Sequence, residues 1–332
     1  MRKSIRQSGA SLSETANVFC LFRLHDAASR GDLAAVRGLL VEGVDVDATD
    51  RLGRSALHKA ALAGHESVVS LLLDAGADLN LRDADYPSHP DDVHIPPIPR
   101  TPLVYAIEGK HLHLVRLCLE RGATTATSNE YQVGALHEAA LLGCCETVQC
   151  LLDQNADPNA AASVNPDLLN RICHHRGWHF HMPLYFAAVA NHLAVLNLLV
   201  RHGADVDGTP TDEAPHGVTA LHDACSSGHV DVVRALLDYG ADPERECSHR
   251  ARPLHYAALN GSPEIVKMLL ERGVLVDSVT VEGDTPLHYA AGQGHQAVCQ
   301  ILVAHGAALN ARNRKGESVS DKAKQAGLTS PF

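Results

Sequence analysis

The chain has 332 residues, of which 45% are hydrophobic but only 4% aromatic, and it carries a formal charge of -11 at pH 7. So few aromatic side chains argue against domains with bulky cores and favour a modular fold packed from small residues. The negative charge disfavours general binding to nucleic acids or anionic membranes, because both need a positive protein surface, so proteins are the expected partners.

Residues 1–21 are expected to form an N-terminal tail, with room for a capping helix. Arg2, Lys3 and Arg6 are followed by no apolar run, which a signal peptide would need, and no later stretch approaches the ~20 apolar residues of a membrane span. A transit peptide is the alternative, because no acidic residue occurs before Glu14. The nine cysteines are an odd number and indicate free thiols, which favour the cytosol or the nucleus over secretion.

One pattern recurs along the chain: a Leu followed by His or another polar residue, then Ala-Ala, then Gly-His and a Leu triplet. Four of the seven intervals between the anchoring leucines are 33 residues, and the other three exceed that period by 13, 15 and 4 residues. The longer intervals therefore indicate insertions. The anchoring leucines are Leu24, Leu57, Leu103, Leu136, Leu184, Leu221, Leu254 and Leu287.

Each unit contains two short apolar runs at helical spacing. In the unit of Leu221, the first run ends at Gly228-His229, a second run follows, and Gly240 is placed as a C-terminal cap residue would be. We therefore expect a helix, a tight turn, a second helix and an extended finger in every unit. Paired alanines such as Ala290-Ala291 would let helices approach closely.

These units resemble the ankyrin repeat. The segment Thr285–Ala291 reproduces the T-P-L-H-x-A-A start of that repeat, and Gly64-His65 with Gly76–Asn80 reproduces the rest. The resemblance implies an all-α repeat solenoid of helix-turn-helix repeats with β-hairpin-like fingers. It implies eight repeats and a C-terminal capping half-repeat, Gly316 to Gly327, within a solenoid at 22–327 with insertions near 84–99 and 160–180, then a tail at 328–332.

The 22 histidines suggest metal or proton chemistry, but the repeat accounts for most of them. Thirteen occupy repeat positions, where we expect them to bond neighbouring finger and turn backbone. They are His25, His58, His137, His222, His255 and His288 after the anchoring Leu, His65, His111, His192, His229 and His295 in the turn, and His202 and His305 after the second helix.

The surface left free by stacking is the concave face of the first helices together with the fingers. Apolar residues gather at these positions in the middle repeats, and such patches usually mark interfaces. The alternative is that they only cover the neighbouring finger. The predicted protein-binding residues are Tyr105, Leu141, Leu142, Trp178, His179, Phe186, Val189 and Tyr256.

The first insertion is rich in proline, from Pro87 to Pro99, so it can be neither helix nor central strand. We expect an extended loop that either presents a proline-rich ligand or is an inert surface loop. A different departure is the set Arg245, His249, Arg250 and Arg252 before the seventh repeat, which forms a basic spot for a carboxylate or phosphate or else a solvated turn beside Glu244 and Glu246.

The second insertion should hold a short helix after Asn165-Pro166 and place Trp178 and His179 at the finger tip. We expect this loop to contact a protein partner. A zinc site is the alternative, with Cys173, His174, His175, His179 and His181 as candidate ligands, but separated ligand pairs are missing. Asn80 lies in an L-x6-D-x-N pattern similar to that of ankyrin repeats modified by asparaginyl hydroxylase, and otherwise stabilises its finger turn.

No phosphate-binding glycine loop, nucleophile elbow or H-E-x-x-H helix occurs, so neither enzyme activity nor a cofactor is expected. The sequence predicts a monomeric, non-catalytic scaffold or adaptor for protein–protein interaction. The alternative is a substrate-recognition or targeting component of an enzyme complex, such as a ubiquitin ligase or a host-directed effector.

Overall fold

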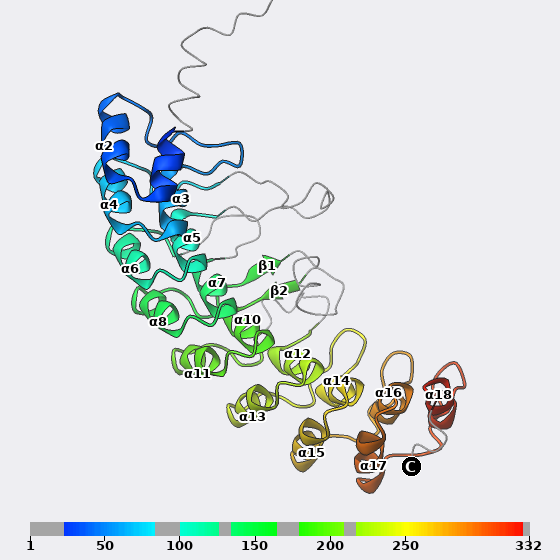
Figure 1. Cartoon of the computed structure of the whole chain (residues 1–332). Coiled ribbons are helices and arrows are strands. Elements are labelled where there is room, and N and C mark those ends of the chain that lie inside the picture. The colour runs from blue at the N-terminus through cyan, green and yellow to red at the C-terminus, as the bar shows by residue number, and fades with distance from the viewer. Residues whose placement is uncertain (1–22, 84–99, 126–133, 165–178, 209–216, 328–332) are drawn as a thin grey trace, which may run out of the picture. The chain divides into compact units, whose positions relative to one another are not determined.

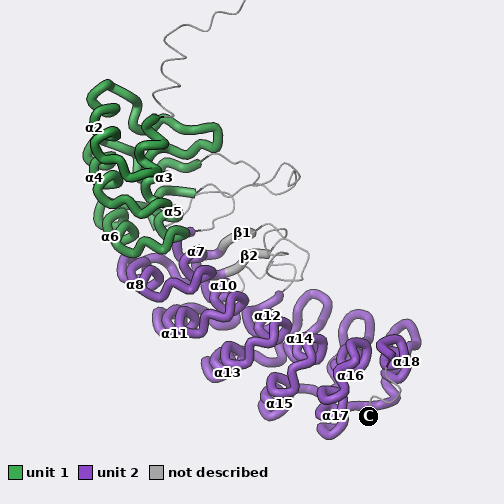
Figure 2. Tube along the Cα trace, in the orientation of Figure 1, with its two compact units in different colours: residues 1–129 green, residues 130–332 purple. Residues whose placement is uncertain are grey.

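The computed structural model confirms the expected all-α repeat architecture in each of two compact units, residues 1–129 and 130–332 (Figures 1 and 2). It describes residues 23–83, 100–125, 134–164, 179–208 and 217–327, without the side chains of 162–164 and 179–181. Within each unit, helix pairs follow one another in sequence order, and the first helix of one pair packs on the first helix of the next.

The first helices of the pairs form one layer in each unit, and repeat 1 contributes a helical segment at residues 23–30. The others are α3 (Ala56–Ala63), α5 (Pro102–Glu108), α7 (Ala135–Leu141), α10 (Pro183–Val189), α12 (Ala220–Ser227), α14 (Pro253–Asn260) and α16 (Pro286–Gly292). The second helices are α2 (Leu33–Val41), α4 (Glu66–Asp74), α6 (Leu112–Glu120), α8 (Cys145–Asp153), α11 (Leu193–Arg201), α13 (Val230–Asp238), α15 (Pro263–Glu271) and α17 (Gln296–Ala304).

The core confirms packing by small side chains. The anchoring leucines Leu57, Leu103 and Leu221 are 0% exposed, and the alanine pair Ala60-Ala61 is 0% exposed beside them. An alanine pair at this position brings helix backbones close together, which is why so few aromatic residues suffice to fill the core.

The finger of repeat 4 is longer than the others. Strands β1 (Ala162–Val164) and β2 (His179–His181) pair in antiparallel fashion, with Ala162 opposite His181 and Val164 opposite His179. The insertion therefore leaves and re-enters the finger on paired strands. This pairing corrects the expected position of His179, which lies in a strand and not at a turn. The expected helix after Asn165, and Trp178, lie outside the described residues.

The half-repeat at the C-terminal side forms helix α18 (Val319–Gln325), as predicted. Ser318 caps this helix, because its hydroxyl accepts from the Asp321 backbone N–H at 3.2 Å while the Asp321 carboxylate accepts from the Ser318 N–H at 2.9 Å. Val319 is 0% exposed, and α18 packs against α16, so the half-repeat covers the first helix of repeat 8.

Candidate protein-binding surface

In six of the eight repeats, the histidine after the anchoring leucine connects the first helix to its finger. In repeat 7, His255 Nδ1 accepts the Arg252 backbone N–H at 3.1 Å, and Nε2 donates to the Ser278 carbonyl at 3.1 Å. These two bonds select the neutral tautomer protonated at Nε2. Burial lowers the pKa of His255 to about 4, although the carbonyl of Ser278 acts in the opposite direction. The equivalent Nε2 bonds are made by His25, His58, His137, His222 and His288.

In five repeats, a turn histidine connects the repeat to the preceding one. His295 Nε2 bonds the Leu259 carbonyl at 3.1 Å, and its ring lies so close to Gly261 that a Cβ there would approach it to 2.5 Å. Gly261 also has a φ of 83°, so both conformation and space favour glycine. His65, His111, His192 and His229 make the same kind of bond, and His202 and His305 bond carbonyls of their own helices. The expected bonds to neighbouring backbone are thus confirmed for eleven of the thirteen histidines, whereas His202 and His305 bond their own helices instead.

A third connection runs along the bases of the fingers. Asn80 Oδ1 accepts the Thr124 backbone N–H at 2.9 Å, and Asp277 Oδ1 accepts that of Ala308 at 3.0 Å. The same position supplies the acceptor in other repeats, through Asp47, Asn159, Asp207 and Glu244. Asn80 is exposed, and its amide oxygen has this structural role. Its hydroxylation stays a prediction.

The predicted apolar patch is largely buried, which corrects the expectation that it is exposed. Tyr105, Phe186, Val189 and Tyr256 are 8, 4, 6 and 8% exposed. The reason is a recurring contact: the aromatic ring of one repeat packs edge-on against the histidine of the preceding repeat, as for His58 and Tyr105 at 5.3 Å. His137–Phe186, His222–Tyr256 and His255–Tyr289 repeat this contact.

The remaining predicted residues have different positions. Leu141 and Leu142 are half-buried at the end of α7, where part of each side chain is accessible. Trp178, Cys173, His174 and His175 lie outside the described residues, and the side chains of His179 and His181 are not described. Tyr105 belongs to unit 1 and the other members of the predicted set to unit 2.

Unit 1 presents charged groups on the first helices and fingers. Asp50 accepts from Lys59 at 2.8 Å and from Arg54 at 3.0 Å. Burial alone would raise the pKa of Asp50, but these two cations hold it well below its usual range. Glu108 pairs with Arg100 at 2.5 Å, and burial raises the Glu108 pKa despite that cation.

The insertion of unit 1 has a closed neck. Asp83 and Arg100 flank residues 84–99, and the Asp83 backbone N–H donates to the Arg100 carbonyl at 3.1 Å. In return, the Arg100 N–H donates to Asp83 Oδ1 at 2.6 Å, while Tyr105 donates its hydroxyl to Oδ2 at 2.7 Å. The two residues that flank the proline-rich loop are thus joined by two hydrogen bonds.

The predicted basic spot of unit 2 is largely neutralised by acidic neighbours. Arg252 pairs with Glu244 and, at 2.8 Å, with Glu246, and Arg250 lies 3.6 Å from Glu246. The hydrogen bond from Arg252 is the main reason that the pKa of Glu246 is lowered. These pairs favour the solvated turn over an anion site.

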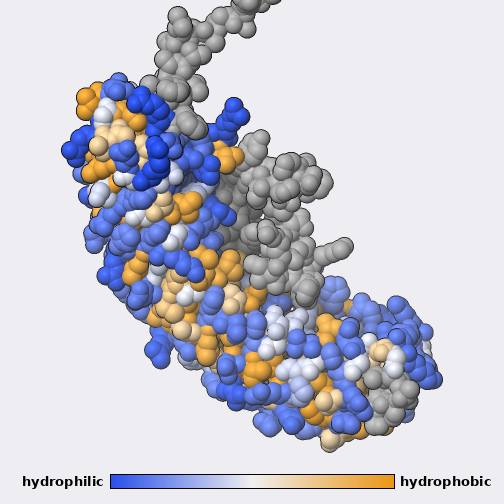
Figure 3. All heavy atoms as spheres, viewed as in Figure 1, coloured by the Kyte–Doolittle hydropathy of each residue, from blue (hydrophilic) through white to orange (hydrophobic). Residues whose placement is uncertain are grey.

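Sequence reasoning missed an apolar surface on the finger of repeat 7. Leu275, Val279 and Val281 are 61, 39 and 37% exposed. The sequence does indicate this surface at one position, because Leu275 lies where repeats 2 and 6 carry Asp78 and Asp242. Three exposed aliphatic residues on one finger form a contact area of the kind found at interfaces. Across the visible face of each unit, hydrophobic and hydrophilic residues intermingle (Figure 3).

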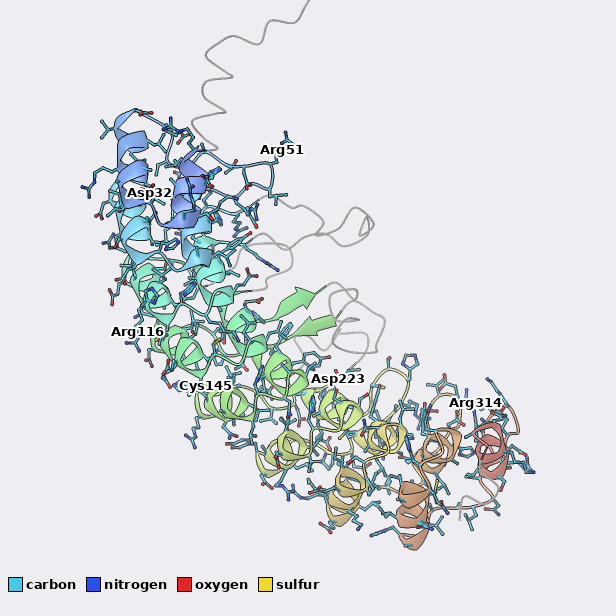
Figure 4. All side chains as sticks on the ribbon, in the orientation of Figure 1. Asp32, Arg51, Arg116, Cys145, Asp223 and Arg314 are labelled. Carbon is cyan, nitrogen blue, oxygen red and sulfur yellow. The ribbon has the colours of Figure 1, made fainter. Side chains whose placement is uncertain are left out.

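The described side chains give no metal centre. No group of three or more His, Cys, Asp or Glu within residues 23–327, outside the undescribed gaps, is arranged to hold a metal ion. The cysteines of this part are free thiols, and Cys145 opens α8 near the surface while Asp223 is buried on α12 (Figure 4). Among the helices described, none is long and apolar enough to cross a membrane.

Comparisons with known proteins agree with this architecture. A family model for ankyrin repeats matches residues 24–89, 86–162, 159–247 and 245–313. The chain is 31% identical to "Ankyrin repeat protein nuc-2" of Neurospora crassa over 66% of its own length and 18% of that protein. It is 28% identical to mouse "Ankyrin repeat and SOCS box protein 14" over 61% of the chain and 30% of the relative. It is 29% identical to rice "Probable E3 ubiquitin-protein ligase XBOS32" over 57% and 40%. The chain thus spans less than half the length of these relatives.

Proposed function

Because this chain belongs to the ankyrin-repeat family, we propose that it is a non-catalytic scaffold or adaptor that binds a protein partner through its first-helix face and fingers. The observation that carries the proposal is how the polar side chains are used. Eleven of the thirteen repeat histidines bond backbone carbonyls of a finger or of the preceding repeat, so the side chains that most resemble catalytic groups have a structural role. What the described surface offers a ligand is contact area and charge.

The binding surface differs between the units. Unit 1 offers charged groups, with Lys59 and Glu108 partly exposed on the first helices. Unit 2 offers Leu141, Leu142 and the exposed valines of the repeat-7 finger. Trp178 and His179 complete the proposed set from the finger of repeat 4.

A second candidate function is substrate recognition for an enzyme complex, either a ubiquitin ligase or a host-directed effector. The names of two relatives favour the ligase version, since one contains a SOCS box and the other is a probable ubiquitin ligase. Both functions use the same kind of surface, so they differ in the partners that the protein recruits.

Affinity purification of the full chain with mass spectrometry distinguishes the two. One stable non-enzymatic partner supports the scaffold, and ligase subunits among the recovered proteins support the alternative. The double variant Val279→Asp/Val281→Asp should lose the partner, whereas the control Val41→Asp, at an 84% exposed site on the outer helix α2, should retain it. If the double variant still bound the partner, the repeat-7 finger would not be part of the binding surface.

The proposal includes a reducing compartment, the cytosol or the nucleus, and a monomeric state. The seven cysteines of the described residues are free thiols, which suits such a compartment. Hydroxylation of Asn80 is a separate proposal, supported by the exposure of that side chain. It is tested by mass spectrometry of the Asn80 peptide from cells that contain an asparaginyl hydroxylase, where a peptide without an added oxygen rejects it.

A further inference from the structure

The fingers of repeats 6, 7 and 8 share one turn. In the last two, the Gly283 N–H donates to the Thr280 carbonyl at 3.0 Å, and the Gly316 N–H donates to the Asn313 carbonyl at 2.9 Å. Repeat 6 forms the same turn from Cys247 to Arg250. Equivalent positions in these fingers are 33 residues apart, so their backbone groups can be compared directly.

The fingers of repeats 6 and 7 each accept two N–H groups from the next finger. At the tip, the His249 carbonyl accepts from Val281 N–H at 2.9 Å, and the Glu282 carbonyl accepts from Arg314 N–H at 2.9 Å. At the base, Glu244 Oε1 accepts from the Leu275 N–H at 2.6 Å. The two donors of repeat 7, Leu275 and Val281, are six residues apart on one extended segment.

Repeat 8 carries the same two acceptors with no ninth finger among the described residues. By register, these acceptors are the Lys315 carbonyl at the tip and the side-chain amide oxygen of Asn310 at the base. No described residue donates to either group, and both residues are exposed. The finger of repeat 8 therefore has an open edge with two acceptors that an extended segment can satisfy.

This edge is positive although the chain is acidic. Residues 310–327 contain five cationic side chains and two acidic ones, a net charge of +3, whereas the formal net charge of the whole chain is -11. Glu317 is engaged by Lys322 at 3.1 Å, and Asp321 caps α18. Arg314 and Lys315 have no ion-pair partner among the described residues, and Arg314 lies on the loop before α18 (Figure 4).

We propose that the open edge of the repeat-8 finger binds an extended, acidic segment of a partner protein. Two backbone N–H groups of that segment bond Asn310 and the Lys315 carbonyl, and its carboxylates pair with Arg314 and Lys315. This site uses none of the residues named above for partner binding, so either proposal can fail without the other.

The test uses the full chain and a fluorescein-labelled decapeptide of alternating Glu and Thr, measured by fluorescence anisotropy. The double variant Arg314→Glu/Lys315→Glu should weaken binding at least about tenfold, because two charge-assisted contacts are lost. Asn310→Ala should weaken it about threefold, since it removes one neutral hydrogen bond. The control Arg37→Glu/Arg116→Glu makes the same change of charge at exposed positions of the outer helices and should bind as the parent does.

A second peptide with every backbone nitrogen methylated separates backbone recognition from charge. We expect it to lose binding, because it keeps the carboxylates but has no N–H donors. Equal binding of the methylated peptide, or of a short RNA of similar charge, would overturn the proposal in favour of non-specific attraction. The proposal would also be overturned if the Arg314→Glu/Lys315→Glu variant bound the peptide as the parent does with an unchanged circular dichroism spectrum. Two further contrary results are no peptide binding by the parent chain and self-association through this edge in sedimentation experiments.

Discussion

Asn260 donates a hydrogen bond from Nδ2 to the carbonyl of Ser226, 3.0 Å away in the preceding repeat. The turn position of repeat 7 holds Ser262 in place of the histidine found in five other repeats. Asn260 lies against Gly228, where a Cβ would approach its Oδ1 to 2.8 Å, much as the turn histidines lie against their glycines. The asparagine therefore replaces the missing imidazole.

Substitution of Asn260 by Ala should lower the free energy of unfolding by about 1 kcal/mol, the usual contribution of one such bond. Gln293 occupies the same position in repeat 8, is exposed and has no hydrogen bond of this kind in the described structure, so Gln293→Ala is the matched control. Urea unfolding followed by circular dichroism gives both values. Equal effects of the two substitutions would show that Asn260 does not connect the repeats.

Acid should destabilise the fold through its buried histidines. Burial lowers the pKa of His255 from 6.5 to about 4, so the folded state binds fewer protons than the unfolded state between these values. The contribution of His255 to the free energy of unfolding is therefore fully present above pH ~6.5 and is lost as the pH falls towards 4. At pH 5 the loss from this residue is about 2 kcal/mol. The pKa values of His25, His58 and His288 are lowered in the same direction, chiefly by burial.

Urea midpoints at pH 7 and pH 5 measure this effect. His255→Gln should show a smaller loss of stability between the two pH values than the parent chain. His113→Gln, an exposed site on α6, should show the same loss as the parent. A parent chain whose stability does not change between pH 7 and pH 5 would contradict the linkage.

Trp178→Ala should weaken binding of the recovered protein partner by about 2 kcal/mol, as expected for a large aromatic side chain at an interface. Tyr239→Ala is the control, because that tyrosine is 39% exposed at the end of the outer helix α13. Isothermal titration calorimetry gives the affinities, and circular dichroism checks the fold. Parent-like affinity of a folded Trp178→Ala protein would exclude the residue from the interface.

The repeat architecture was predictable because its signals are local and occur many times. Leucine spacing, the Gly-His turn and the alanine pairs located the helix pairs, and the histidine positions predicted the backbone bonds. The burial of Tyr105 and Phe186 was only one of two alternatives from the sequence, because it depends on a histidine in the preceding repeat, which no single repeat shows. The sequence left an anion site and a solvated turn open for Arg252, because it does not show that the guanidinium is directed at Glu246.

In repeats 6 to 8 the bonds between neighbouring fingers recur with a period of 33 residues, so a repeat with the same residues at those positions can follow any of the three. Removal of repeat 7 as one 33-residue block would leave Glu244 facing the Ala308 N–H and His249 facing the Arg314 N–H. Genetic duplication or loss of such a block changes the length of the protein without creating a new kind of junction. Lineages of this protein can therefore vary in repeat number while each retained repeat keeps its bonding pattern.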